Sequence, residues 1–469
     1  MTTGRPLVAL GRSAHRDATG ERPTYDIREV QRAVRGVAAR LGWSGSADAP
    51  AFARVLPAGA RVVVKPNLVL HTNRGDGGIE PLLTHTAMIR VVVEELLASG
   101  AGAVVLGDAP IQECDFNALL EVTGLGEWAA TLAAREPRFS GPRDYRRTHA
   151  SFVDGVRVER EGVLSVDRFV LYDLGSESLL EPISRPGIFR VTQYPPGEME
   201  RTHGPGRHQY LVARDIIEAD VVVNLPKLKT HKKAGVTCAL KNLIGINGNK
   251  EYLPHHRVGG ASDGGDCYPG SDAVKRALEY VYDQANTTRS LGVRRALSLP
   301  TRVLERVLHE RGDELGIEGS WSGNDTIWRT CLDLNRVLLY GRPDGTVAND
   351  PQRRVLHLVD AITAGHANGP LRPEPLPMGL VIGGDNAAAV DLVAARLLGY
   401  DPARIPIAAH AFDRFHWPLT GFAADEVEVL DESGESVAAL ELPARTAGVE
   451  TMRYPVGWLD AVAPAPSTR

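Results

Sequence analysis

The stretch ARVVVKPN, residues 60–67, decides the fold class of this chain. Its three successive valines are typical of a strand that is buried on both faces of a parallel sheet. The stretch THTAMIRVVVEELLASG, residues 84–100, follows with the spacing of a helix that opens on a threonine cap and ends at Gly100. A buried strand followed by a helix is the repeating unit of an α/β fold.

Four further apolar runs repeat the strand pattern. They are AVVLGDAP (103–110), IEADVVVNLPK (217–227), RVLHLVDAITAG (354–365) and MGLVIGGDN (378–386). After the last run, apolar residues fall at helical spacing until Gly399. The sequence therefore predicts an α/β fold with a mostly parallel open sheet and helices on both faces, extended by a small β excursion and a helical insertion or cap.

Changes in composition divide the chain into six expected segments. We expect an N-terminal α/β lobe at 1–136, a small β-rich excursion at 137–215, the basic loop and a core strand at 216–269, a helical insertion or cap at 270–342, a C-terminal α/β part with an edge hairpin at 343–460, and a disordered tail at 461–469.

Composition and charge argue against several classes of protein. The 469 residues carry a formal net charge of −5 with 43% apolar content, which is typical of a globular chain and speaks against nucleic-acid binding. No run reaches the roughly 18 apolar residues of a membrane span, and the N-terminus lacks the apolar core of a signal peptide. We therefore expect a cytoplasmic protein without membrane contact.

The four cysteines lie far apart in the sequence, at positions 114, 238, 267 and 331. This spacing fits neither a disulfide scaffold nor the ligands of zinc or an iron–sulfur cluster. Buried, reduced thiols are the expected state. The dinucleotide-binding glycine fingerprint, the P-loop, the H-E-x-x-H zinc motif and the G-x-S-x-G nucleophile elbow are also missing, which argues against the chemistry that each supports.

Polar side chains follow each of the five apolar runs. In an open parallel sheet the carboxyl ends of the strands share one edge, where ligands bind. We therefore expect these side chains to converge around one crevice: Lys65 and Asn67, Asp108, Asn224 with Lys227 and Lys229, Asp360, and Asp385 with Asn386.

The densest chemical signal is the basic stretch NLPKLKTHKKAGVTCALKNLIGINGNKEYLPHHR, residues 224–257. Seven lysine and arginine residues stand against one acid, Glu251, with His231, His255 and His256 added. So much like charge repels itself unless an anion offsets it, and the interleaved glycines let backbone N–H groups approach that anion. We therefore expect the basic stretch to bind a ligand that carries a phosphate or carboxylate group.

These residues suggest roles in a small-molecule enzyme. Lys65, Lys227, Lys229 and Lys241 would clamp the anion, Asn67, Asn224 and Asn242 would orient it, and His255 and His256 would add further contacts. Lys241, His231, Asp108 and Asp360 are the candidate catalytic groups, since a buried lysine is a candidate base or nucleophile. Asp108 and Asp360 could hold a divalent metal, either Mg²⁺ or a transition metal with a histidine.

Several stretches resemble the bacterial and archaeal family catalogued as domain of unknown function 362. They are VVVKPNLV (62–69), GDAP (107–110), ADVVVNLPKLKTH (219–231), VTCALKNLIGINGNKEYLPHH (236–256) and GGDNAAAVDLVAARLLGYDP (383–402). The resemblance spans roughly residues 55–410 and assigns no chemistry. Many members of that family append a ferredoxin-like cysteine cluster. This chain lacks one, which argues against an electron-transfer role and an iron–sulfur cofactor.

A fainter resemblance links the chain to the nickel-pincer lactate racemase family. It rests on the order of His231, Gly235, Lys241, Gly245 and one of His255 or His256. This resemblance is at the level of the fold, which does not carry function.

Three functions remain open from the sequence. The first is group transfer or hydrolysis on a small phosphorylated or carboxylated metabolite, aided by a divalent metal. The second is isomerisation or racemisation by proton abstraction. The third is a non-catalytic protein that binds a polyanion or a cofactor, although the basic stretch offers only Tyr252 for stacking on bases. The sequence leaves the substrate, the metal and the oligomeric state undetermined.

Overall fold

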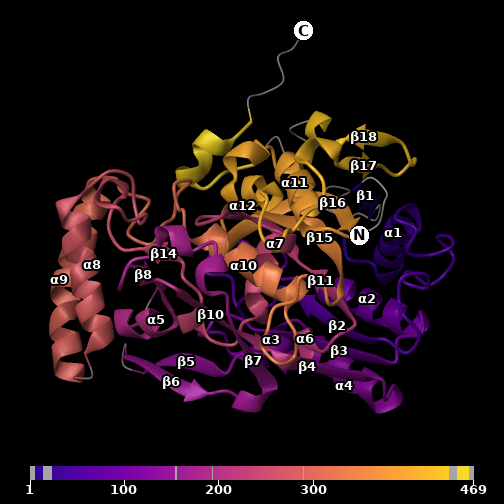
Figure 1. Cartoon of the computed structure of the whole chain (residues 1–469), viewed down its shortest axis with the longest axis horizontal. Helices are drawn as coiled ribbons and strands as arrows, with labels where there is room; N and C mark the ends of the chain where they lie inside the picture. Colours follow the sequence, from indigo (N-terminus) through magenta and orange to yellow (C-terminus); the bar gives the residue numbers. More distant parts are fainter. Residues whose placement is uncertain are drawn as a thin grey trace, which may run out of the picture.

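A central sheet of eleven strands organises the computed structural model, which describes residues 6–13, 24–153, 156–192, 194–288, 290–442 and 452–463 (Figure 1). The strand order is β18-β17-β1-β16-β15-β11-β2-β3-β4, and β12 extends the sheet by pairing with β15 and β13. The bounds are β1 Leu7–Arg12, β2 Arg61–Pro66, β3 Ala103–Asp108, β4 Phe139–Asp144, β11 Val221–Leu225, β12 Lys227–His231, β13 Gly235–Thr237, β15 Arg354–Asn368, β16 Arg372–Gly384, β17 Glu428–Leu430 and β18 Ser436–Ala438.

The parallel part of the sheet comprises β15, β11, β2, β3 and β4. Alternate residues of β2 pack into different cores: Val62 and Val64 join one apolar cluster and Val63 joins another, and all three are fully buried. Layers therefore cover both faces, as the sequence predicts. One face carries α1 (Ile27–Arg40), α2 (Thr86–Ala98), α3 (Phe116–Val122) and α4 (Leu125–Arg135), and the other carries α10 (Ile327–Tyr340) and α11 (Ala387–Leu397).

Strand β16 runs antiparallel to β15, contrary to the expected convergence of all five strand ends. The two strands form a long hairpin, so the end of β16 returns to the start of β15, where His357 pairs with Gly384. Asp385 lies there and binds Trp43 and Arg354. Asp385 and Asn386 therefore lie at the edge of the sheet opposite to the ends of the parallel strands, because a hairpin reverses the direction of the chain.

The ends of the helices agree only in part with expectation. Helix α11 ends before Gly399, which has a positive φ of 78° and terminates the helix as predicted. Helix α2 begins instead at His85, whose ring accepts a hydrogen bond from the backbone N–H of Ala87. Thr84 serves another purpose, because its hydroxyl donates to the carbonyl of Leu225 and accepts from the N–H of Asn67. Thr84 thus ties the ends of β2 and β11 together.

Smaller elements surround the central sheet. Three short sheets are formed by β5 (Thr148–Val153) with β6 (Val156–Glu161), by β7 (Phe169–Asp173), β10 (Arg207–Ala213) and β9 (His203–Gly204), and by β8 (Phe189–Arg190) with β14 (His256–Arg257). The short helices are α5 (Pro196–Thr202), α6 (Arg214–Ile217), α7 (Ala239–Asn242) and α12 (Pro406–Ala409), and α6 connects β10 to β11 of the central sheet.

The helices expected in a cap occupy two different places. Helices α8 (Ala273–Thr287) and α9 (Leu291–Glu310) form a hairpin beside β8 and β14, at the left of Figure 1. Helix α10 instead lies in the interior, where Trp328, Cys331 and Leu338 are buried in the main apolar clusters. Of the helices expected in the cap, α8 and α9 therefore lie at the margin of the molecule and α10 does not (Figure 1).

The C-terminal region adds two strands and a packed segment. Strands β17 and β18 pair antiparallel at one edge of the sheet, which confirms the expected edge hairpin. Ala461 and Ala463 are buried, whereas the rest of the tail expected to be disordered, residues 464–469, lies outside the described residues.

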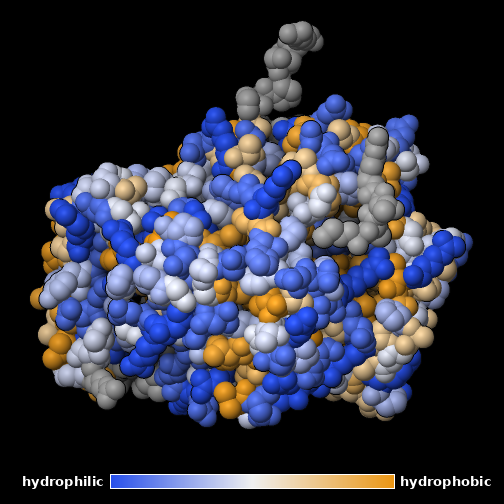
Figure 2. Space-filling view, viewed as in Figure 1, coloured by the Kyte–Doolittle hydropathy of each residue, from blue (hydrophilic) through white to orange (hydrophobic). Residues whose placement is uncertain are grey.

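The surface of the described face is mostly hydrophilic, and the four cysteines lie in the interior. Hydrophilic residues cover most of the face shown in Figure 2. Among the described residues, no helix has both the length and the hydropathy needed to cross a lipid bilayer. The four cysteines are all unpaired and buried, as the sequence predicts.

Candidate functional site

A cavity of about 600 Å³ opens at the carboxyl ends of β2, β3 and β12. The turn between β15 and β16, residues 368–372, closes one side, and the loop from Lys241 to His255 closes another. Six of its lining residues are lysines: Lys65, Lys229, Lys232, Lys233, Lys241 and Lys250. We call it the basic cavity.

The structure brings most of the predicted site residues to this cavity. Those that line it are Lys65, Asn67, Asp108, Lys229, His231, Lys241, Asn242 and His255. Four others do not line it: Asn224, Lys227, Asp360 and His256. The two groups differ in what their side chains contact.

Lys65 and Asp108 form a buried ion pair in the wall of the cavity, with 2.7 Å between Nζ and Oδ1. Lys65 also donates to the side-chain oxygen of Asn242 and to the carbonyl of Pro66, so all three of its N–H donors are used. Backbone N–H groups of Leu68 and Ala109 donate to Asp108. Because both groups are fully engaged, they shape the wall and leave no donor free for an anion.

Gly245 is required by this pair. A β-carbon at position 245 would collide with the carboxylate of Asp108 and the ammonium of Lys65. The carbonyl of Gly245 also accepts a hydrogen bond from the N–H of Ala109. The glycine in the predicted anion loop therefore serves the close packing of that loop against β2 and β3.

Lys227 and Asp360 form a second buried ion pair, away from the cavity, with 2.7 Å between Nζ and Oδ2. Tyr25 donates to Asp360 and accepts from Lys227, and the carbonyl of Thr363 accepts from Lys227. The N–H of His85 donates to Asp360 as well. This cluster joins β12, β15 and the start of α2, so the two residues predicted as clamp and catalyst hold the fold instead.

Two of the predicted asparagines, Asn224 and Asn242, form a chain of hydrogen bonds inside the protein. Asn242 donates to the side-chain oxygen of Asn224, which in turn donates to the carbonyl of Ala239. Asn224 is fully buried and Asn242 nearly so. They fix α7, and with it Lys241, against the end of β11.

Four lysines of the cavity lack a carboxylate partner among the described residues: Lys229, Lys241, Lys250 and Lys232. Lys229 donates to the carbonyl of Leu82 at 2.6 Å and is fully buried, and Lys241 is 9% exposed. Burial lowers the pKa of both amines. The nearby positive charges of Lys227 and Lys241 lower the pKa of Lys229 further. Burial and the charge of Lys241 lower the pKa of Lys250 to about 7.

The carboxylates that line the cavity do not offset these amines. Asp108 pairs with Lys65, Glu113 with Arg74, and Glu318 with Lys233 at 3.7 Å. Each acid in the lining is therefore matched to a basic group of its own, and the four lysines without a carboxylate partner among the described residues add surplus positive charge. A bound anion would remove the cost of burying them.

The use of lysine in this chain is unusually concentrated. Only eight lysines occur in the sequence, where arginine supplies the other basic residues, and six of the eight line the basic cavity. A buried lysine can lose its proton near neutral pH, whereas arginine stays charged. The choice of lysine here is therefore suited to chemistry that needs an amine with an adjustable charge.

Two histidines of the cavity are fixed in opposite tautomers. Backbone N–H groups of Lys233 and Ala234 donate to Nδ1 of His231, so the proton of its neutral ring is on Nε2. Nδ1 of His255 lies 2.6 Å from the carbonyl oxygen of Leu253, which can only accept a hydrogen bond. Nδ1 therefore carries the proton of the neutral ring, and Nε2 carries a lone pair. Burial and nearby lysines hold the pKa of both rings well below the usual value. His231 is thus a donor and His255 an acceptor.

His256 turns away from the basic cavity. It follows His255 directly in an extended segment, so the two side chains point to opposite sides, and His256 lines a separate cavity. The prediction that both would contact one ligand is therefore not supported by the geometry.

The predicted pair of metal-binding carboxylates is not brought together. Strands β2 and β11 lie between β3 and β15, so about 14 Å of sheet separates Asp108 from Asp360. Within the ranges that the structure describes, no three side chains of His, Cys, Asp or Glu are grouped to hold a metal ion.

Some lining residues could not be selected from the sequence. Arg372 and the turn at 368–372 reach the cavity because β15 and β16 extend beyond the sheet, which hydropathy does not reveal. Lys250 lies in the basic stretch, but its low pKa depends on burial in the folded chain. The sequence indicates Lys250 only through its position in the basic stretch, and no pattern in the sequence shows that its pKa would be lower than that of Lys232.

Thermal stability is expected to rise between pH 7 and about pH 9, and Lys250→Met should reduce this rise. The pKa of Lys250 is about 7 in the folded chain, against about 10.4 in an unfolded chain. Between these values the unfolded chain holds more protons, so raising the pH favours the folded state. The melting midpoints of both proteins at the two pH values provide the measurement. Equal rises would show that Lys250 ionises normally in the folded protein.

Comparisons with known proteins place the chain by sequence. A family model described as "Domain of unknown function (DUF362)" matches residues 62–171 and 186–396. A search of curated proteins found no match. The resemblance to the nickel-pincer lactate racemase family gains no support from these comparisons.

A solved structure of a protein from Thermotoga maritima is similar to 76% of this chain with 12% identity and a TM-score of 0.31. The matched region spans about half of that protein, 55% of its length. A similarity of this size supports no inference about the function of the chain.

Proposed function

The chain belongs to the family described as "Domain of unknown function (DUF362)", and because that description assigns no chemistry, we propose a function from the basic cavity. The protein is an enzyme that binds a small phosphorylated or carboxylated molecule there and moves a proton on it. The observation that carries this proposal is the burial of Lys229 and Lys241 beside the partly exposed Lys250 and Lys232, in one cavity and without carboxylate partners among the described residues.

An anionic ligand is favoured by the charge of the cavity. An ammonium buried without a partner costs several kcal/mol, roughly, and this cost is relieved by loss of the proton or by an opposite charge. A phosphate or carboxylate between these lysines would raise their pKa values and make charge-assisted hydrogen bonds. Binding should therefore take up protons from the solvent at neutral pH.

Proton transfer is favoured by the two histidines. Nε2 of His255 can accept a proton from a C–H bond of the ligand, and the electron pair left on carbon moves to the adjacent carbonyl oxygen. The Nε2–H of His231 can donate a hydrogen bond to the negative charge that develops there. A bound anion offsets the lysine charges around His255, so it raises the pKa of that ring and makes it a better base.

Group transfer or hydrolysis aided by a divalent ion is a second candidate. It is favoured by the surplus lysine charge, which would stabilise a phosphoryl group during transfer, and a divalent ion at Asp108 would have to displace Lys65 from that carboxylate. Asp360 lies outside the lining, so Asp108 would have to serve with oxygens of the ligand.

The proposal is tested by incubating the protein in D₂O with small phosphate esters and carboxylic acids that carry an acidic C–H bond. We expect one compound to gain a deuterium, measured by mass spectrometry, and His255→Gln to abolish the gain. Titration calorimetry with inorganic phosphate tests binding separately. Binding of phosphate without exchange in any compound would favour group transfer, and the absence of phosphate binding would overturn the proposal.

Salt dependence distinguishes a small ligand from a polymer. A polyanion displaces many counterions, so its affinity falls steeply with salt concentration, whereas a small anion gives a shallow slope. We expect the shallow slope for phosphate and no measurable binding of a single-stranded oligonucleotide at physiological salt.

A further inference from the structure

A second cavity of about 320 Å³ adjoins the basic cavity. It lies between the α8–α9 hairpin and strands β8 and β14, and it shares Val191, Thr192, Tyr194 and Glu318 with the lining of the basic cavity. Its volume is near the lower end of the range, about 300–1,000 Å³, found for small-molecule sites. We call it the acidic annex.

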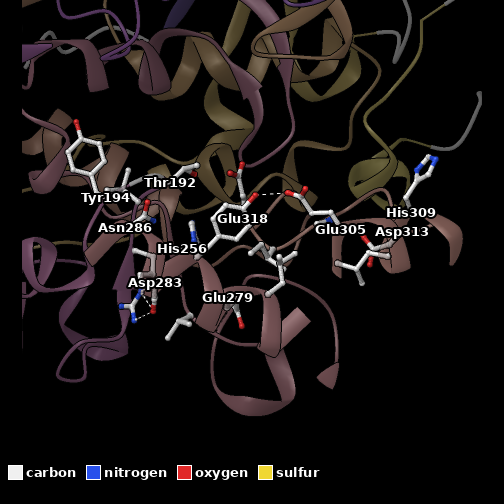
Figure 3. A pocket seen from close by; sticks show the side chains of 18 residues that line it. Thr192, Tyr194, His256, Glu279, Asp283, Asn286, Glu305, His309, Asp313 and Glu318 are labelled. Atoms are coloured by element: carbon white, nitrogen blue, oxygen red, sulfur yellow. Dashed lines mark hydrogen bonds and ion pairs between the residues drawn. The ribbon is translucent and has the colours of Figure 1, made fainter. Parts of the chain in front are cut away.

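The annex combines apolar walls with carboxylates. Val258, Leu278, Leu308 and Ile317 provide the apolar walls. Figure 3 shows the acids that line it, with Glu279 and Asp283 from α8 and Glu305 from α9. Its chemistry is therefore the reverse of that of the basic cavity.

Three of the five carboxylates that line the annex already pair with basic side chains: Asp283, Asp313 and Glu318, the last with Lys233 as described above. Asp283 binds Arg190 through both oxygens, and Asp313 pairs with Lys275. Glu305 accepts a hydrogen bond from the hydroxyl of Tyr282, drawn as a dashed line in Figure 3. A tyrosine leaves the charge of Glu305 in place.

Glu279 is the strongest indication of a missing partner. It is 7% exposed and accepts from the N–H of Gly259 and the hydroxyl of Tyr268. Lys275, one turn earlier on α8, is directed to Asp313 instead, and no ion pair reaches Glu279 within the described ranges of the chain. A buried carboxylate with only neutral donors lacks the positive charge that would offset its burial.

His256 supplies an independent observation. It is 6% exposed and lines the annex, and its Nδ1 atom has no hydrogen-bond partner among the described residues. Burial and the charges of Lys233 and Arg190 hold its pKa well below the usual value, so the ring is neutral. A buried polar atom that lines a cavity and lacks a partner in the protein is available to a water molecule or a ligand in that cavity.

We propose that the annex binds the positively charged end of the same ligand whose anionic end occupies the basic cavity. The proposal rests on the function proposed above. One cavity holds buried amines without acids, and its neighbour holds a buried acid without an amine. A molecule with a phosphate or carboxylate at one end, an apolar middle and an ammonium at the other would offset both charges and cover the apolar walls.

The test uses ω-aminoalkyl phosphates of increasing chain length, compared with inorganic phosphate and with alkyl phosphates that lack the amine. We expect one chain length to bind about tenfold more tightly than its amine-free counterpart, because a hydrogen bond to a charged group contributes about that much. Glu279→Gln should remove this gain and leave the affinity for inorganic phosphate unchanged. Glu305→Gln, whose amide oxygen can still accept from Tyr282, should reduce the gain less and serves as a second variant if Glu279→Gln does not fold.

The outcomes separate this inference from the proposed function. If no chain length gains affinity from the amine, or if the gain survives both substitutions, the inference is overturned while phosphate binding stands. If inorganic phosphate itself does not bind, the function proposed for the basic cavity fails first.

Discussion

Asp360→Ala is expected to lower the free energy of unfolding by about 3–5 kcal/mol, because it leaves Lys227 buried and unpaired. Both side chains are fully buried, and Tyr25 would lose its acceptor in the same step. Urea unfolding monitored by circular dichroism gives the measurement. The affinity of the folded variant for phosphate should not change, since neither residue lines the basic cavity.

Two comparisons make the result interpretable. The double variant Lys227→Met/Asp360→Leu should regain most of the lost stability, because an apolar pair can replace a buried ion pair. Glu310→Ala removes an exposed pair with Arg306 on α9 and should change stability by about 0.5 kcal/mol or less. An Asp360→Ala protein as stable as the parent would contradict the structural role assigned to the pair.

Lys241→Met is expected to weaken phosphate binding by about 10- to 100-fold, the range for losing a hydrogen bond to a charged group. The unfolding free energy should stay the same or rise, because no described group depends on the amine and methionine is well suited to a buried position. Titration calorimetry and urea unfolding measure the two effects on the same samples. Reduced affinity without reduced stability separates a binding role from a structural one.

Lys275→Met is the matched control for this prediction. Lys275 is also buried, but it pairs with Asp313 outside the basic cavity. The Lys275→Met protein should be less stable than the parent and should keep its affinity for phosphate, which is the opposite of the result expected for Lys241→Met. Unchanged phosphate binding in Lys241→Met would remove Lys241 from the ligand site.

The sequence predicted the parallel core because hydrophobicity reports burial directly. Val62, Val63 and Val64 could only be buried together in a strand covered on both faces, and they are. The direction of β16 could not be read in the same way, since an apolar strand has the same composition whether it runs parallel or antiparallel. For that reason the expected place of Asp385 was wrong.

The site was predictable as a location and less so in its details. Lys227 and Lys229 are two residues apart on β12 and equally buried, yet only Lys227 has an acid beside it. A register shift lies between them where β12 pairs with β15, and no sequence pattern announces it. Which lysine is neutralised therefore depends on tertiary pairing, which decides whether it holds the fold or remains available to a ligand.

The separation of His255 and His256 could have been predicted. Consecutive residues of an extended segment point to opposite sides, so the adjacent pair was never suited to one ligand. The alternation needed only the expectation that this segment is extended, and β14 begins at His256.

The concentration of lysine has a practical consequence for handling this protein. Among the lysines, those that reagents acylate, or through which supports couple, would mainly be residues that line the basic cavity, where Lys232 and Lys233 are partly exposed. Thiol-directed labels offer no substitute, because all four cysteines are buried. A fluorophore or sensor surface should therefore be attached through an engineered cysteine on the outer face of α9, for example at Arg302, where it would leave the ligand path open.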